Sequence, residues 1–192
     1  MKTNGTTGKF IVTLASISAL VALIKVAQQG SAQDKPAQTS ERIGVHDSRA
    51  IAVAFAGSPT HEKQLRELIA EHQKAKAAGD LDRVAKLEAE GKARQTKAHK
   101  QGFSTAPVDD LLVHITNSLP QIQKAAGVTA ILSKWDEAGL KKHPRSERVD
   151  VTLSLVDAFQ PTERQRKSAN EIQKHKPISL KQAERIKDQA LS

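Results

Sequence analysis

Two short apolar runs bracket a long, polar, helix-rich stretch of the chain. The first run covers residues 42–48 (RIGVHDS) and the second covers residues 127–132 (GVTAIL). Short β-branched runs bounded by Gly or polar residues are typical of buried strands. The roughly eighty residues between them show helical periodicity and helix caps. The pattern predicts a mostly α, α+β fold: a small β-containing base, a projecting antiparallel helical hairpin and a helical C-terminal tail.

The hairpin is predicted from two helices joined by one turn. Ser58 is a good N-cap, and Pro59 at the first helical position starts a helix that reaches about Ala77. Gly79-Asp80 forms the turn, and Asp80 can cap the second helix. Apolar side chains on the two helices predict an antiparallel coiled coil. This candidate arm-packing stripe contains Leu65, Leu68, Ile69, Leu81 and Val84, with Ala85 and Leu87 continuing it.

Shorter helices flank the hairpin. Ser48 is expected to cap a buried helix over 49–55, which Gly57 ends. On the return path Gly102 and Pro107 interrupt the helix, and Thr105 is expected to cap its continuation. The arm should therefore cover about 59–126.

The C-terminal part begins after the second strand. Residues 149–152 (VDVT) predict a short connector, with Thr152 capping a helix over 153–159. Residues 161–192 form a basic, polar tail whose first part, 161–177, is expected to be a solvated helix or disordered. Ser179 with Gln182 resembles a capping box for a last helix.

The N-terminal 32 residues predict an export segment. Lys2 and Lys9 precede an apolar run over 10–24, and small residues at Gly30 and Ala32 suit a signal peptidase. We interpret residues 1–32 as a signal peptide or N-terminal anchor and 33–41 as a linker. The expected location is the periplasm, or the inner membrane if the segment is retained.

The chain is strongly basic, with a formal net charge of +9. Without residues 1–32 it keeps 27 Lys and Arg against 21 Asp and Glu. In an exported protein this balance favours acidic clients or acidic lipid headgroups. Aromatic residues are only 3% of the chain, so nucleic-acid binding by base stacking is not expected. The candidate client or acidic-partner surface is Arg83, Lys86, Lys92, Arg94, Lys97 and Lys100, which could equally be a solvated helix face.

The sequence contains no recognisable catalytic or metal-binding motif. There is no Cys, and the seven His have no metal-ligand spacing. A carboxylate–His pair between Asp109 or Asp110 and His114 is conceivable. Nucleophile-elbow and phosphate-loop motifs do not occur. We therefore expect no enzyme activity, no cofactor and no metal.

The order of these segments resembles the Skp/OmpH family of periplasmic chaperones, as a divergent, short-armed member. The likeness rests on residues 42–48, residues 119–132 (LPQIQKAAGVTAIL), and residues 149–152 followed by 153–159. It covers about 42–160, and its specificity lies in the order of degenerate motifs.

The resemblance implies a homotrimer whose helical arms hold unfolded outer-membrane or envelope proteins. The arm is short, its return path is broken at Gly102 to Pro107, and the tail after Pro161 has no family counterpart. The alternative is a membrane-anchored coiled-coil scaffold or envelope-assembly protein without chaperone activity.

Overall fold

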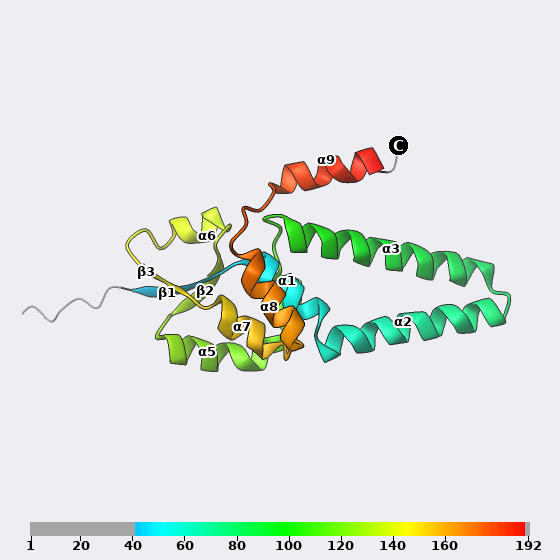
Figure 1. Ribbon diagram of the computed structural model, residues 1–192, viewed down its shortest axis with the longest axis horizontal. Coiled ribbons are helices and arrows are strands. Elements are labelled where there is room, and N and C mark those ends of the chain that lie inside the picture. Colours follow the sequence, from blue (N-terminus) through cyan, green and yellow to red (C-terminus); the bar gives the residue numbers. More distant parts are fainter. Residues whose placement is uncertain (1–40, 191–192) are drawn as a thin grey trace, which may run out of the picture. The chain divides into compact units, whose positions relative to one another are not determined.

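The computed structural model describes residues 41–190, with side chains to residue 185. This part of the chain is mostly helical and contains a small three-stranded parallel sheet (Figure 1). The expected export segment, 1–32, and nearly all of the linker lie outside the described residues. Among the residues described, no helix is both long and apolar enough to cross a membrane.

The sheet has the strand order β2-β1-β3, and both outer strands run parallel to β1. Its strands are β1 (Arg42–His46), β2 (Ala130–Ser133) and β3 (Glu147–Asp150). Two neighbouring parallel strands need a long crossover connection between them. All the helices between residues 48 and 126 form the crossover from β1 to β2. A short helix, α6 (Glu137–Lys141), lies between β2 and β3.

Strand β3 was missed in the sequence, where 149–152 was expected to be a connector. Its sequence, ERVD, contains one apolar residue, and the strand lies at the edge of the sheet with most of its residues exposed. An exposed edge strand carries little hydrophobic periodicity, so its pairing is visible only in three dimensions.

Both predicted strands are shorter than expected, because residues at one end of each cap a neighbouring helix. Strand β1 stops at His46, since Asp47 caps the next helix. Strand β2 starts only at Ala130, because Gly127 ends the preceding helix in the left-handed region at φ 63°. The Val128 N–H donates to the Gln123 carbonyl at 3.0 Å, which closes that helix end.

Helix α1 (Ser48–Ala56) is the centre of the main core. Its cap is Asp47, whose side chain accepts from the Arg49 N–H, and not the predicted Ser48. Helix α1 packs against α3 (Leu81–Phe103), α7 (Thr152–Ala158) and α8 (Glu163–Ile172). Its Ala50, Ile51 and Ala54 are fully buried. A helix that is apolar nearly all round is buried in this way by neighbours on several sides.

Helices α2 (Pro59–Ala77) and α3 (Leu81–Phe103) lie side by side after a tight turn (Figure 1). The predicted bounds and cap of α2 are confirmed, and the Ser58 Oγ accepts from the His61 N–H at 3.1 Å. The Asp80 carboxylate caps α3 by accepting from the Arg83 N–H at 3.0 Å. Gly79 adopts φ 70°, which suits a residue without a Cβ.

The return path ends the helix pair at Phe103 and joins the body. Helix α3 continues through Gly102, and Thr105 is not a cap, because α4 (Asp109–Leu112) begins after Val108. A 3-10 helix, η1 (Val113–Ser118), and α5 (Leu119–Ala126) follow. Residues of α4, η1 and α5 pack into or against the main core; they are Leu111, Ile115, Leu119, Ile122 and Ala126. The helix pair therefore spans 59–103 and not the expected 59–126.

The C-terminal part contributes three further helices, α7 (Thr152–Ala158), α8 (Glu163–Ile172) and α9 (Leu180–Ala190). Thr152 is the first residue of α7 and does not cap it. Helix α8 packs on α1, and its Ala169 is fully buried. Of the two alternatives expected for 161–177, a solvated helix or disorder, the helix is present as α8, but one side of it is docked on the core and not solvated. The predicted cap before α9 is confirmed, since the Ser179 Oγ accepts from the Gln182 N–H at 3.2 Å.

Candidate functional site

The predicted arm-packing stripe is only partly an internal contact between α2 and α3. Ala75 and Leu87 are buried, and Leu68 and Val84 are partly buried. Leu65 and Ile69 remain 46% and 47% exposed. The helix pair therefore presents apolar surface on α2 that its own partner helix does not cover.

The prediction that Leu81 belongs to the arm-packing stripe is wrong, because its side chain is 78% exposed. It is the first residue of α3, directly after the turn, so it lies beyond the end of α2 at Ala77. Helical spacing put Leu81 in the predicted stripe, but spacing alone could not show that a residue at the start of α3 would stay exposed.

Polar groups flank the contact between the two helices. The His72 Nε2 lies 3.2 Å from a Glu88 carboxylate oxygen, and Arg83 lies 3.9 Å from Glu71. Leu68 and Leu87 form the apolar part of an open groove between the helices. Its other lining residues are Gln64, Glu67, Glu71, Arg83, Glu90 and Arg94. The groove thus combines a narrow apolar floor with charges of both signs.

The predicted basic surface on α3 is largely paired with acidic groups. Four of its six members form ion pairs: Arg83 with Glu71 at 3.9 Å, Arg94 with Glu90 at 2.5 Å, Lys97 with Asp110 at 2.8 Å and Lys100 with Glu184 at 3.3 Å. Lys86 and Lys92 are exposed and have no acidic group within 4.0 Å in the described part of the chain. The helix therefore does not present a continuous face of free cations. Three of the acids come from α2, α4 and α9, so spacing within α3 could not reveal them.

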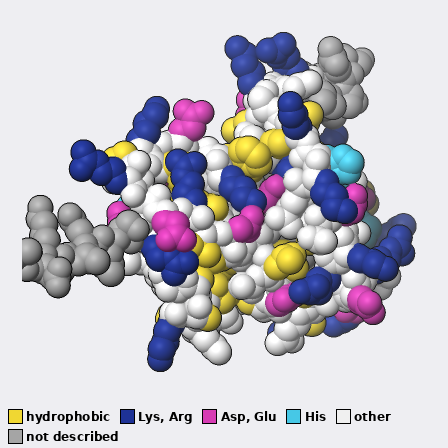
Figure 2. Space-filling view, turned by 60° about the vertical axis from the view of Figure 1, so that its left-hand side comes forward, with side chains coloured by type: hydrophobic (Ala, Val, Ile, Leu, Met, Phe, Trp, Pro, Cys, Tyr) yellow, Lys and Arg dark blue, Asp and Glu magenta, His cyan; other side chains and the backbone are white. Residues whose placement is uncertain are grey.

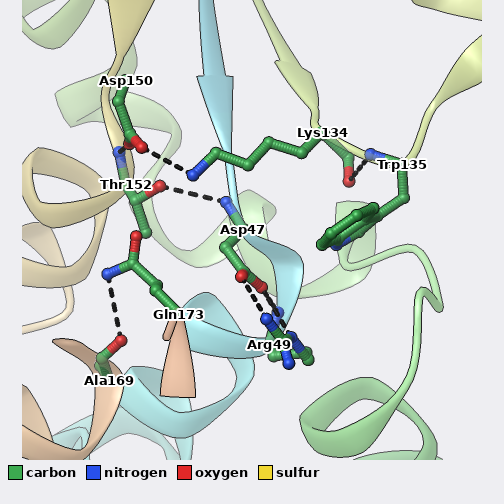
Figure 3. Close-up of polar contacts among 9 residues, drawn as sticks. Asp47, Arg49, Lys134, Trp135, Asp150, Thr152, Ala169 and Gln173 are labelled. Carbon is green, nitrogen blue, oxygen red and sulfur yellow. Dashed lines mark hydrogen bonds and ion pairs between the residues drawn. The ribbon is translucent and has the colours of Figure 1, made fainter. Parts of the chain in front are cut away.

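A second polar cluster lies at the carboxyl edge of the sheet (Figure 3). Asp47 and Arg49 form a buried bidentate pair, with side chains 3% and 2% exposed. The Arg49 Nε donates to Asp47 Oδ1 at 3.0 Å, and its terminal nitrogen donates to Oδ2 at 2.6 Å. The Arg49 guanidinium also lies 5.9 Å from the centroid of the Trp135 ring. The burial of this pair was not visible in the sequence, because charged residues near a helix start are usually exposed.

The same cluster joins the ends of β1, β2 and β3. The Asp47 N–H donates to the Thr152 Oγ1 at 3.1 Å, and the Thr152 N–H donates to Asp150 at 2.9 Å. Lys134 donates to Asp150 at 2.6 Å (Figure 3). Burial alone would raise the pKa of Asp150, but the hydrogen bonds from Lys134 and Thr152 outweigh it and lower that pKa. The charged groups of this cluster pair with one another inside the protein. The cluster therefore has a structural role: it holds together the chain segments that follow the three strands.

His46 lies at the end of β1, only 3% exposed. Burial lowers its pKa to about 4, although the charges of Asp109 and Asp47 oppose the shift. In the described part of the chain its Nδ1 has no hydrogen-bond partner. His46 is therefore neutral at pH 7, and protonating it would place an unfavourable charge in the core.

We expect the His46 environment to make the fold acid-sensitive. The folded-state pKa is about 4, below the ordinary 6.5. The neutral form therefore stabilises the fold fully above pH 6.5, and this contribution is lost as the pH falls toward 4. The loss is about 3 kcal/mol. Urea unfolding at several pH values should show a shallower decline for His46→Gln than for the wild type over this interval. Parallel curves would contradict the assignment.

The conceivable pair between His114 and Asp109 or Asp110 does not form. The His114 ring instead stacks on Phe55, with centroids 5.0 Å apart, and Asp110 accepts from Gln101 at 2.7 Å. Phe55 also contacts His61, whose pKa is lowered by burial and by the charge of Arg94. Over the residues that the structure describes, no group of three or more acidic or His side chains could hold a metal ion.

Comparison with known proteins gives this chain no relatives. No protein-family model matches it, and neither a curated protein nor a solved structure does.

Proposed function

We propose that this protein is an exported, non-enzymatic holdase that resembles the Skp/OmpH chaperones. In this proposal α2 and α3 form an antiparallel helical hairpin that projects from the small β-containing base. The hairpin binds unfolded outer-membrane or envelope proteins in the periplasm, and the protein assembles as a homotrimer. The proposal needs neither a cofactor nor a metal.

The observation that carries this proposal is the uncovered apolar surface of α2. Leu65 and Ile69 are about half exposed, and α3 does not cover them. Around them the helix surface is charged, with ion pairs such as Arg66 with Glu62. Apolar side chains surrounded by charge can hold an unfolded chain loosely while keeping the complex soluble.

Solution mass, measured with and without a client, tests the proposal. The protein is mixed with an unfolded outer-membrane protein on dilution from urea, and the mass is followed by light scattering. A trimer that keeps the client soluble would support the proposal. A protein that leaves client aggregation unchanged would contradict it.

We predict that a Leu65→Gln, Ile69→Gln double variant holds its client about 30-fold more weakly. Each half-exposed side chain would lose about 1 kcal/mol of apolar contact, together about 2 kcal/mol. Client affinity can be measured by fluorescence anisotropy of a labelled outer-membrane protein. The matched control is a Val113→Gln, Leu153→Gln variant, which removes two exposed apolar side chains from the body. Equal weakening in the two variants would refute a client surface on the hairpin.

A membrane-anchored coiled-coil scaffold is the second candidate. The i, i+4 spacing of Leu65 and Ile69, both about half exposed, also suits the seam of a coiled coil with a partner helix. In this case the protein would retain residues 1–32 and would not suppress client aggregation. N-terminal sequencing of the protein from cells, combined with the aggregation assay, separates the two candidates.

A further inference from the structure

The parallel sheet gathers three chain segments at its amino edge. All three strands run in one direction, so the segments that lead into them meet at the same edge. These segments are Glu41 before β1, the end of α5 with residues 127–129 before β2, and residues 142–146 before β3. Direct contacts join them: the Thr129 N–H donates to the Arg42 carbonyl at 2.9 Å, and the Glu147 N–H donates to the Glu41 carbonyl at 2.8 Å.

This amino edge carries a group of free cations. Each of the four side chains is exposed and has no acidic group within 4.0 Å among the described residues. They are Lys124, Lys142, Arg145 and Arg148. Lys141 lies beside this group and forms an ion pair with Glu137 at 3.9 Å, between side chains that are 80% and 86% exposed. Figure 2, in which the left-hand side of Figure 1 comes forward, shows several Lys and Arg side chains standing out from the surface.

The nearby acids do not neutralise this group. Glu41 lies 2.9 Å from His143, and Glu147 lies 3.0 Å from Arg42, so both carboxylates already have partners. The hydrogen bond from His143 is the main cause of the lowered pKa of Glu41. On α3, by contrast, four of the six predicted basic residues are paired. The amino edge therefore has four cations without an acidic partner, compared with two, Lys86 and Lys92, in the predicted basic set on α3.

We propose that the amino edge binds the anionic headgroups of a lipid bilayer, with Lys124, Lys141, Lys142, Arg145 and Arg148 as the contacts. The chain enters the sheet at this edge, and the apolar run 10–24 precedes it in the sequence. Residues 25–40 between them span at most about 55 Å when fully extended. A membrane that holds the apolar run, in transit or as an anchor, is thus within reach of the edge. Exposed Lys and Arg side chains near such a surface are attracted over about one Debye length.

This placement also orients the protein. Strand β1 runs away from the amino edge into α1, and α2 and α3 follow on the opposite side of the body (Figure 1). The helix pair would then point away from the bilayer, with Leu65 and Ile69 accessible. The proposal does not rest on client binding, because it uses a different set of residues.

Lysine footprinting of the full chain tests the proposal. The protein is acetylated in the presence of vesicles of phosphatidylcholine alone or phosphatidylcholine mixed with phosphatidylglycerol, and each lysine is followed by mass spectrometry. Residues 1–32 are the same in both samples, so insertion of the apolar run does not distinguish them. Anionic vesicles are expected to protect the edge lysines, Lys124, Lys141 and Lys142. The lysines of the helix pair, Lys76, Lys86 and Lys92, are expected to stay unprotected. Protection that is equal with both lipids, or that falls on the helix pair, would overturn the proposal.

Two triple variants provide the matched comparison, with Lys141 as the reporter. The edge variant is Lys142→Gln, Arg145→Gln and Arg148→Gln, and the control is Lys76→Gln, Lys86→Gln and Lys92→Gln. The edge variant should need on the order of 100-fold more anionic lipid for half-protection of Lys141. The control should titrate like the wild type. An edge variant that also titrates like the wild type would refute the assignment of these residues.

Discussion

Replacing Asp47 with Ala is expected to lower the free energy of unfolding by about 3–5 kcal/mol. The variant leaves the guanidinium of Arg49 buried, 2% exposed, without its bidentate carboxylate. A buried charge that loses its partner keeps its full desolvation penalty. The variant also loses the side-chain cap of α1.

Urea unfolding followed by circular dichroism measures this effect. The control is Asp136→Ala, which removes an exposed carboxylate that caps α6 by accepting from the Gly139 N–H at 2.9 Å. This control should cost about 1 kcal/mol. An Asp47→Ala, Arg49→Met double variant should recover part of the loss, because no unpaired charge remains. A loss for Asp47→Ala no larger than that of Asp136→Ala would show that the buried pair does not stabilise the fold.

Replacing Ala169 with Asp is expected to lower the free energy of unfolding by about 3–5 kcal/mol. Ala169 is fully buried where α8 packs on α1, and a carboxylate there would have no partner. The main core contains Ala169 and, at its margin, Ile172, so the core needs residues beyond the expected domain end at 160.

The neighbouring position provides the control. Ser168 is exposed on the same helix, and Ser168→Asp should change the unfolding free energy by no more than about 0.5 kcal/mol. Thermal unfolding monitored by circular dichroism compares the two variants. If Ala169→Asp and Ser168→Asp unfold at the same temperature, α8 does not belong to the cooperative core.

The sequence by itself predicted the elements that depend on local signals. The bounds of α2, the caps at Ser58 and Asp80, and the ends at Gly57 and Gly127 all follow from hydrogen bonds and backbone angles within a few residues. Caps and left-handed glycines are local chemistry, so the sequence pattern placed these correctly, although the caps predicted at Ser48, Thr105 and Thr152 do not form. The two apolar strands were also visible, because buried strands are rich in β-branched residues.

The tertiary structure alone decided which side chains meet. The acidic partners of Arg83, Lys97 and Lys100 come from other elements, and the edge strand β3 has almost no apolar pattern. Helix α8 looked solvated because Ala169 is its only fully buried residue, with Ile172 at the margin of the core. The free cations of the amino edge come together only because the strands are parallel. Contacts between residues far apart in the chain depend on topology, which short-range propensity does not encode.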